Sequence, residues 1–268
     1  MAVLPHARGL VRSIVVAAIV AAAVVGASDT GVSGTGFPGG APLLRVPVLM
    51  YHLIVPVAEA HGAAPELVVP PEEFAAQMDA LRTAGWHSIT AGRLASYLEA
   101  RETPPARTFV VTIDDGYDDG YTYASPILRE NGFVASYYVV AGRIGHSHNL
   151  NAGQLQALAA AGNEIGSHSM THRHLSGLGG DELAGEICAA SDAIEAITTR
   201  RPATFAYPFG DRDRNVAAAV LSCRGLLMAL STRLGSSETW AGRFDVPRIA
   251  VEPHTRPADL LDLMGRGA

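Results

Sequence analysis

The chain alternates short apolar runs with longer segments of mixed polarity. The short runs are typical of strands buried on both faces, and they lie at residues 46–52, 88–90, 108–113, 133–140, 164–168, 204–210, 226–231 and 246–251. Segments with a one-sided apolar stripe predict helices at 71–86, 91–102, 123–132, 151–163, 180–199 and 214–225. This alternation predicts an α/β fold, with a parallel sheet covered by helices and closed, or nearly closed, into a barrel.

Polar residues gather where the predicted strands end. In barrels of this kind the chemistry takes place at the carboxyl ends of the strands. The residues concerned are His52, Asp114, Asp115, His168, His172 and the turn that follows Tyr207. Two adjacent acids directly after a buried strand are unusual, and we expect them to belong to a functional site.

A histidine pair and a carboxylate predict a metal site. His168 and His172 are four residues apart, which lets both rings face one point on a helical turn or a tight loop. Two histidines and a carboxylate, here Asp115, form a common shell for a catalytic divalent metal. Alternatively, the histidines belong to a polar surface and the acids to a turn.

The acids of the "DDGYDDG" stretch divide into two groups. Side chains alternate at a strand end, so Asp114 and Asp115 can do different work. With Asp115 on the metal, Asp114 is free to act as general base on the attacking water. We expect Asp118 and Asp119 to open the next helix, where acids suit the helix dipole.

The N-terminus differs from the rest of the chain. Two arginines precede the apolar run 13–25, and small residues follow, which predicts a secretory signal peptide over 1–27. An uncleaved membrane anchor is the alternative. Residues 28–42 are rich in Gly, Ser and Pro and predict a flexible linker, which leaves 43–268 for the folded domain. We therefore expect an exported protein, secreted or associated with the cell envelope, that contacts the membrane only through its N-terminal segment.

The amino-acid composition limits the kinds of partner that this protein can bind. The 268 residues carry a net charge of −6 and no basic block, which argues against nucleic acid. Cys188 and Cys223 are the two cysteines. In an exported protein they could pair, but two buried free thiols are an equal alternative.

Three motifs carry a family resemblance. "TIDDGY", "GNEIGSHSMTHRHL" and "FAYPFGDRD" together resemble the polysaccharide deacetylases with NodB homology, carbohydrate esterase family 4. The opening "VPVLMYH" and the stretches "FAAQMDALRTAGWHSIT" and "VTIDDGYDDGYTYASPILRENGFVASYYVV" resemble the branch of exported poly-N-acetylglucosamine deacetylases. The resemblance covers roughly residues 47–251 and implies a distorted (β/α) barrel with fewer than eight full repeats.

The resemblance also implies an activity and a metal. It implies removal of N-acetyl groups from an N-acetylglucosamine-containing polysaccharide of the envelope or the extracellular space, aided by one divalent ion. By position, Asp115, His168 and His172 match the metal triad, and Asp114 matches the catalytic base. Zinc is the default ion, although such sites also accept cobalt, nickel or iron.

Other roles follow from the third motif and the chain's departures from it. The family takes an oxyanion-binding N–H from the residue after Pro208, which is Phe209 here, so the turn with Tyr207 is a candidate for substrate binding. The usual Arg of this motif is replaced by Ala206. We expect Arg248 to fill its place by pairing with Asp114; a structural surface arginine is the alternative.

The leaving amine needs a proton from a general acid. In the resembled branch the histidine of "MYH" serves, which makes His52 the candidate here, with His254 as the alternative. Trp240, in a polar loop, is a candidate platform for a sugar ring. Two other functions remain open: an amidohydrolase of the same fold that acts on a small amide or cyclic imide, and a catalytically inactive carbohydrate-binding module.

Overall fold

The computed structural model describes residues 43–60 and 63–267. The signal peptide and linker predicted for 1–42 lie outside these residues. Among the described residues, none of the helices combines the length and the apolar character needed to cross a membrane.

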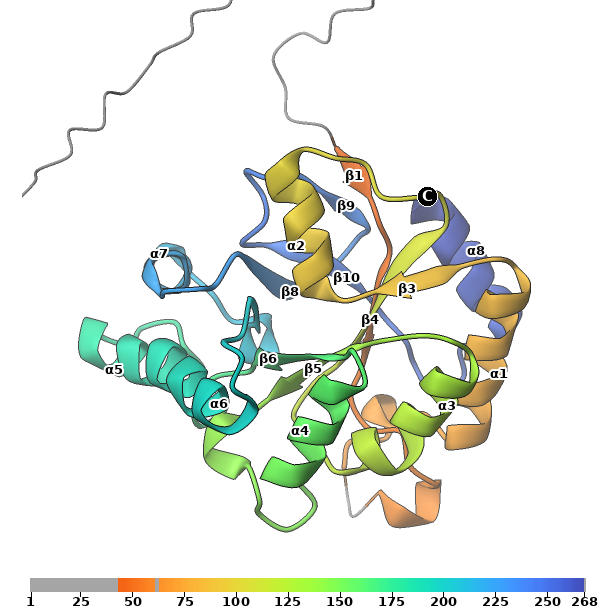
Figure 1. The fold of residues 1–268 in the computed structure, drawn as a ribbon, viewed down its shortest axis with the longest axis horizontal. Helices are drawn as coiled ribbons and strands as arrows, with labels where there is room; N and C mark the ends of the chain where they lie inside the picture. The colour runs from red at the N-terminus through yellow and green to blue at the C-terminus, as the bar shows by residue number, and fades with distance from the viewer. Residues whose placement is uncertain (1–42, 61–62, 268) are drawn as a thin grey trace, which may run out of the picture. The chain divides into compact units, whose positions relative to one another are not determined.

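Seven parallel strands close into a barrel at the centre of the domain (Figure 1). They follow the order β2 (Val48–Tyr51), β10 (Val246–Ala250), β8 (Met228–Leu234), β7 (Thr204–Ala206), β6 (Glu164–Ser167), β5 (Ser136–Val139) and β4 (Thr108–Ile113). The barrel closes because β4 also pairs with β2, in the register Val48↔Val110. An eighth strand, β3 (His87–Ile89), pairs with the first half of β4 outside the ring. The predicted α/β barrel with fewer than eight repeats is confirmed.

Helices surround this barrel (Figure 1). The α-helices are α1 (Pro71–Thr83), α2 (Ala91–Ala100), α3 (Ser125–Glu130), α4 (Ala152–Ala160), α5 (Gly180–Ala184), α6 (Ala190–Thr198), α7 (Arg214–Ser222) and α8 (Pro257–Gly267). Single 3₁₀ turns lie at Val57–Glu59, Pro65–Leu67, Ala141–Arg143 and Pro208–Gly210, and π-helical turns at Gly120–Ala124 and Gly185–Ala189. The helix predicted over 180–199 is therefore α5 and α6 joined by a π-helical turn.

The sequence patterns missed two features of the fold. Helix α8 follows the last strand and packs against α1. A small antiparallel pair joins β1 (Leu44–Arg45) to β9 (Ser237–Glu238). Both elements escaped prediction because two-residue strands are too short to show a period, and because the Pro-rich stretch before α8 reads as a loop.

The alternation of side chains along β4 explains why Asp114 faces the interior at one end of the barrel. Val110 belongs to the cluster that fills the interior with Met228, Leu230 and Val246. Phe109, Val111 and Ile113 instead join the cluster outside the ring, beneath α1 and α3. Both faces of the strand are buried, so apart from two buried threonines, Thr108 and Thr112, its sequence is apolar. The next inward position after Val110 and Thr112 is that of Asp114.

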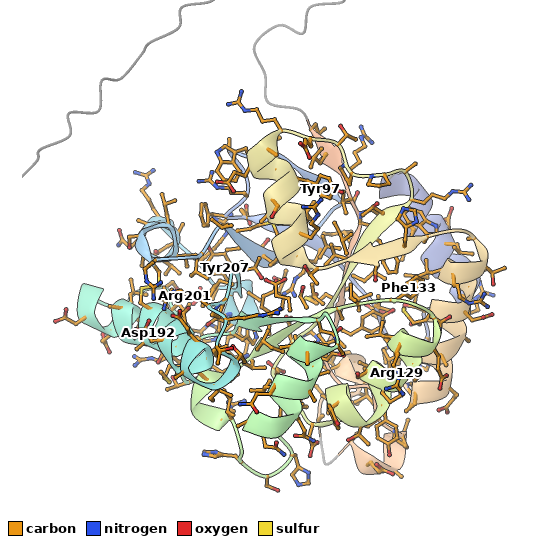
Figure 2. All side chains as sticks on the ribbon, viewed as in Figure 1. Tyr97, Arg129, Phe133, Asp192, Arg201 and Tyr207 are labelled. Carbon is orange, nitrogen blue, oxygen red and sulfur yellow. A yellow bond between two sulfur atoms is a disulfide. The ribbon has the colours of Figure 1, made fainter. Side chains whose placement is uncertain are left out.

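The two cysteines form a disulfide. Cys188, in the π-helical turn between α5 and α6, is bonded to Cys223 at the end of α7. Arg201 ties the same region together, because its guanidinium lies 2.5 Å from Asp192 and 2.7 Å from Glu195 on α6 (Figure 2). The alternative of two free thiols is therefore wrong for this structure.

Candidate active site

The predicted metal triad converges at the carboxyl end of the barrel strands. The Oδ1 atom of Asp115 lies 3.4 Å from His168 Nε2 and 3.1 Å from His172 Nε2. One ligand atom from each of the three residues lies within 4.8 Å of the others. A carboxylate oxygen and two ring nitrogens at such separations could all bind one small cation.

His168 is held in the orientation that metal binding requires. It follows β6 directly, and its main-chain N–H donates to Val139 O at 2.9 Å, which continues the sheet. Its ring is buried, with Nδ1 2.8 Å from the carbonyl oxygen of Ala206. Because a carbonyl only accepts, Nδ1 carries the proton and Nε2 keeps its lone pair for a ligand.

The loop between the two histidines is ordered by a buried acid that the sequence analysis missed. Glu186 accepts hydrogen bonds from Met170 N at 3.1 Å, Thr171 N at 2.9 Å and Thr171 Oγ1 at 2.6 Å. It is 6% exposed. A signal was available, because Glu186 stands on the apolar face of its helix, three residues after buried Leu183.

Four residues of this loop and its neighbours have a strained backbone. Asp115, Ser169, His172 and Phe209 have positive φ angles of 71°, 67°, 62° and 58°. Non-glycine residues seldom adopt this region, and they tend to do so at functional sites. The histidine pair is thus set by a tight loop rather than a helical turn, and Ser169 Oγ secures it by accepting from His172 N at 2.9 Å.

The two aspartates diverge for a reason other than the one expected. Asp114 continues the inward alternation of β4, and its N–H donates to Tyr51 O at 2.9 Å. Alternation alone would send Asp115 out of the barrel. Its left-handed backbone turns it back over the same end, toward the histidines. Gly116 follows at φ 71°, where a Cβ would come within 3.1 Å of Val139.

Arg248 pairs with Asp114 inside the barrel. Its two terminal nitrogens each lie 2.8 Å from an oxygen of Asp114, while Nε donates to Ser231 O at 2.9 Å. Arg248 is 1% exposed and Asp114 is 2% exposed, so the alternative of a surface arginine is wrong. Burial alone would raise the pKa of Asp114, but the Arg248 guanidinium opposes it and the net shift is downward. Asp114 therefore stays ionised at neutral pH.

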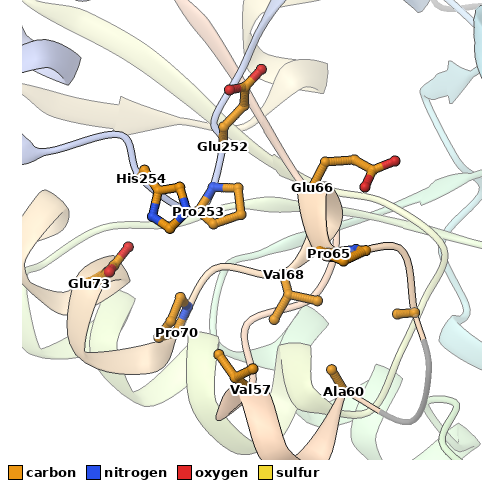
Figure 3. Close-up of a pocket in the computed structure, with 11 residues that line it drawn as sticks. Val57, Ala60, Pro65, Glu66, Val68, Pro70, Glu73, Glu252, Pro253 and His254 are labelled. Atoms are coloured by element: carbon orange, nitrogen blue, oxygen red, sulfur yellow. The ribbon is translucent and has the colours of Figure 1, made fainter.

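His52 belongs to the same group of charges. It follows β2 and is mostly buried, which lowers its pKa, while Asp114 and Asp115 act in the opposite direction. His254 lies elsewhere. It is exposed, on the wall of a groove of about 710 Å³ whose other lining residues include Glu66, Glu73 and Glu252 (Figure 3). The structure thus brings His52, and not His254, to the paired aspartates.

The turn after β7 contributes main chain and one exposed ring. Phe209 is 56% exposed, and its ring centroid lies 4.6 Å from that of His172 and 4.4 Å from that of His174. Pro208 is buried. The Tyr207 ring is buried in the outer core, and its hydroxyl donates to Phe244 O at 3.0 Å (Figure 2). The Tyr207 main-chain N–H donates to Leu230 O and its carbonyl accepts from Gly210 N, so Tyr207 is part of the core and the suggested role in substrate binding is wrong for this residue.

Asp118 and Asp119 stand at the start of the next helical segment, as expected: the Asp118 carbonyl accepts from Thr122 N, and the π-helical turn Gly120–Ala124 begins directly after Asp119. The Asp119 side chain does not cap that turn; it is buried, 4% exposed, and its Oδ2 accepts from Ile54 N at 2.6 Å.

The sugar platform suggested at Trp240 does not lie at the site. Trp240 lies in the loop that enters β10, at the opposite end of the barrel from the site, and packs under Arg243. The polar, turn-forming residues around Trp240 in the sequence gave no sign of its position in the fold.

The donor set fits a divalent metal ion. Asp115 offers a carboxylate oxygen, and the hydrogen bond of His168 to Ala206 leaves the required nitrogen free. The mixture of two imidazoles and one carboxylate suits zinc and the other divalent transition metals. Three protein ligands leave coordination positions for water and substrate.

Comparisons with known proteins agree with this geometry. The family model for polysaccharide deacetylase matches residues 101–224, which contain all three ligands and Asp114. The Bacillus subtilis protein named "Putative polysaccharide deacetylase YxkH" is 28% identical over 209 residues, covering 78% of this chain and 72% of that protein.

Two solved structures share the fold. The Streptococcus pyogenes deacetylase PplD in complex with acetate superposes with a TM-score of 0.78 at 23% identity, covering 83% of this chain and 99% of that chain. A de-N-acetylase from Aggregatibacter actinomycetemcomitans gives a TM-score of 0.71 at 16% identity, covering 81% of this chain and 99% of that chain.

Proposed function

We propose that this chain, which belongs to the polysaccharide deacetylase family, removes N-acetyl groups from an N-acetylglucosamine-containing polysaccharide. One observation carries the proposal: the Asp115–His168–His172 triad and the Arg248-paired Asp114 meet at one end of the barrel. A binding module would have no use for a buried, ionised carboxylate beside a metal site. The similar fold of a protein named as a de-N-acetylase supports the choice of bond.

The triad would hold one divalent ion, for which zinc is our first choice and cobalt, nickel or iron the alternatives. When bound, such an ion polarises the amide carbonyl and lowers the pKa of water toward about 7. The protein's own residues supply the remaining steps.

Asp114 takes the proton from the attacking water. Its pKa is held low by Arg248 after burial has acted against ionisation, so it is a weak base that is always in the basic form at neutral pH. A weak base suffices where the water is already acidified. Arg248 keeps both Asp114 oxygens in fixed positions. The carboxylate can therefore accept the proton of water only on the sides that the guanidinium does not occupy.

The water oxygen bonds to the amide carbon as its proton passes to Asp114. The tetrahedral oxyanion would be stabilised by a main-chain N–H in the Phe209 turn. His52 then gives a proton to the amide nitrogen as the carbon–nitrogen bond breaks, which releases acetate and a glucosamine amine. Burial lowers the pKa of His52, so its protonated form is a stronger acid than a free imidazolium.

We also propose that the enzyme acts outside the cytoplasm, on envelope or extracellular glycan. The support is the sequence of residues 1–27, which has the features of a secretory signal, together with the Cys188–Cys223 disulfide.

The test is acetate release from a panel of substrates. N-acetylglucosamine oligomers, peptidoglycan and a cyclic imide would be incubated with the protein before and after chelation, and again after zinc is restored. We expect acetate from at least one glycan, loss of release with chelator and recovery with metal. Hydrolysis of the imide without glycan turnover would favour the small-molecule amidohydrolase. Absence of all turnover in a metal-loaded protein would contradict the proposal.

A further inference from the structure

Asp119 is a buried carboxylate that the proposed chemistry does not use. It is 4% exposed, although it lies only four residues after Asp115. One of its oxygens, Oδ2, accepts from Ile54 N at 2.6 Å. The other, Oδ1, is buried and has no hydrogen-bond partner among the described residues. Burying a carboxylate on so few contacts is costly, which makes Asp119 a candidate for a functional role.

The partner of Asp119 lies two residues beyond His52. Ile54 is itself fully buried, and the bond joins residues 65 positions apart in the chain. Between them, Leu53 is fixed on its other side, since its N–H donates to Leu67 O and its carbonyl accepts from Val69 N. After β2 ends at Tyr51, the chain thus passes through His52 into a segment that Asp119 holds at Ile54.

The same aspartate-rich segment holds both sides of His52. On the near side, Asp114 N donates to Tyr51 O at 2.9 Å. On the far side, Asp119 accepts from Ile54 N. His52 is therefore bracketed by two hydrogen bonds to one short stretch, and that stretch also carries Asp114 and Asp115. Removal of the second bond would free His52 to move relative to both acids.

We propose that Asp119 is a positioning residue, which fixes the main chain after His52 so that the imidazole faces Asp114 and Asp115. This inference rests on the proposed function, in which His52 delivers the proton to the leaving amine. A π-helical turn, Gly120–Ala124, begins directly after Asp119. Such turns occur often at functional sites.

The test compares two neighbouring acids in the metal-loaded full chain. Asp119→Ala removes the acceptor, Asp119→Asn keeps one acceptor oxygen, and Asp118→Ala is the matched control at the adjacent, more exposed acid. Because a misplacement of about 1 Å can cost about a hundredfold in rate, we expect D119A to lower kcat by roughly tenfold to a hundredfold. KM and bound metal should stay close to wild type, and D119N should recover most of the rate.

Two readouts separate positioning from a general loss of structure. If Asp119 acts through His52, then H52A/D119A will be no slower than H52A. Equal slowing by D119A in both backgrounds would overturn the proposal. The second readout needs no substrate: the NMR resonance of the His52 ring, assigned by its absence in H52A, should shift or split in D119A but not in D118A. An unchanged resonance in D119A would overturn the inference, while absent acetate release by wild type would count only against the proposed function.

Discussion

The Arg248–Asp114 pair provides the sharpest test of the site's electrostatics. Arg248→Met removes the guanidinium from a position that is 1% exposed, while the methionine fills most of its volume. Asp114, 2% exposed, then loses both hydrogen bonds of 2.8 Å, and Ser231 O loses the bond from Nε. An unpaired charge remains in the barrel.

The size of the effect follows from this burial. Breaking a buried ion pair by removal of one partner costs about 3–5 kcal/mol, because the remaining charge is uncompensated. We expect a loss of this order in the free energy of unfolding for R248M. Asp114→Asn in the same background removes that charge, so the double variant should be about 3 kcal/mol more stable than the sum of the two single changes implies.

Denaturant unfolding of the four metal-free proteins measures this coupling directly. The exposed Arg256–Asp259 pair, which also makes two hydrogen bonds, is the matched control, and R256M/D259N should show no measurable coupling. Activity should fall in R248M as well, because burial without Arg248 raises the pKa of Asp114 and leaves less of the base ionised. Additive losses at Arg248 and Asp114 would refute the reasoning.

Two further predictions concern the other buried acids. Glu186→Gln weakens three hydrogen bonds to the loop between His168 and His172. The Kd for zinc, measured by competition with a chelator, should therefore rise about tenfold or more. Glu182→Gln, at an exposed position one turn away, should leave this Kd unchanged. Burial raises the pKa of Asp119 to about 7, above its unfolded value, so its contribution to stability is present at low pH and is lost as pH rises toward 7. Between pH 5 and pH 7 the unfolding free energy of wild type should therefore fall relative to D119N, by up to about 1.4 kcal/mol per pH unit, and parallel curves would contradict this assignment.

The strands of the barrel and the metal ligands could be predicted because local patterns encode them. Residues 108–113 were predicted as a strand and form β4 with the same bounds. Both faces of such a strand are buried, so it carries no charged residue and ends where the aspartates begin. His168, His172 and Asp115 could be grouped because parallel strands bring their carboxyl ends together.

The partners of these residues could not be predicted in the same way. The bond between Asp119 and Ile54 and that between Glu186 and Thr171 depend on how loops fold back, which no period in the sequence records. Asp115 shows a subtler limit. Its direction depends on one positive φ angle, which the alternation of strand side chains does not predict. Arg248 was paired with Asp114 only as one of two alternatives, because its depth in the barrel depends on the register between β10 and its neighbours.

The most direct test of the central claim is acetate release by Asp114→Asn in its metal-loaded form. Asparagine keeps the shape of the side chain and an acceptor for Arg248, but it cannot take a proton from water. Zinc content by mass spectrometry and acetate release from N-acetylglucosamine oligomers would be measured on the same preparation. The proposed function predicts one bound zinc per chain and a fall in kcat of about a hundredfold or more. Full acetate release by a zinc-loaded D114N would contradict it.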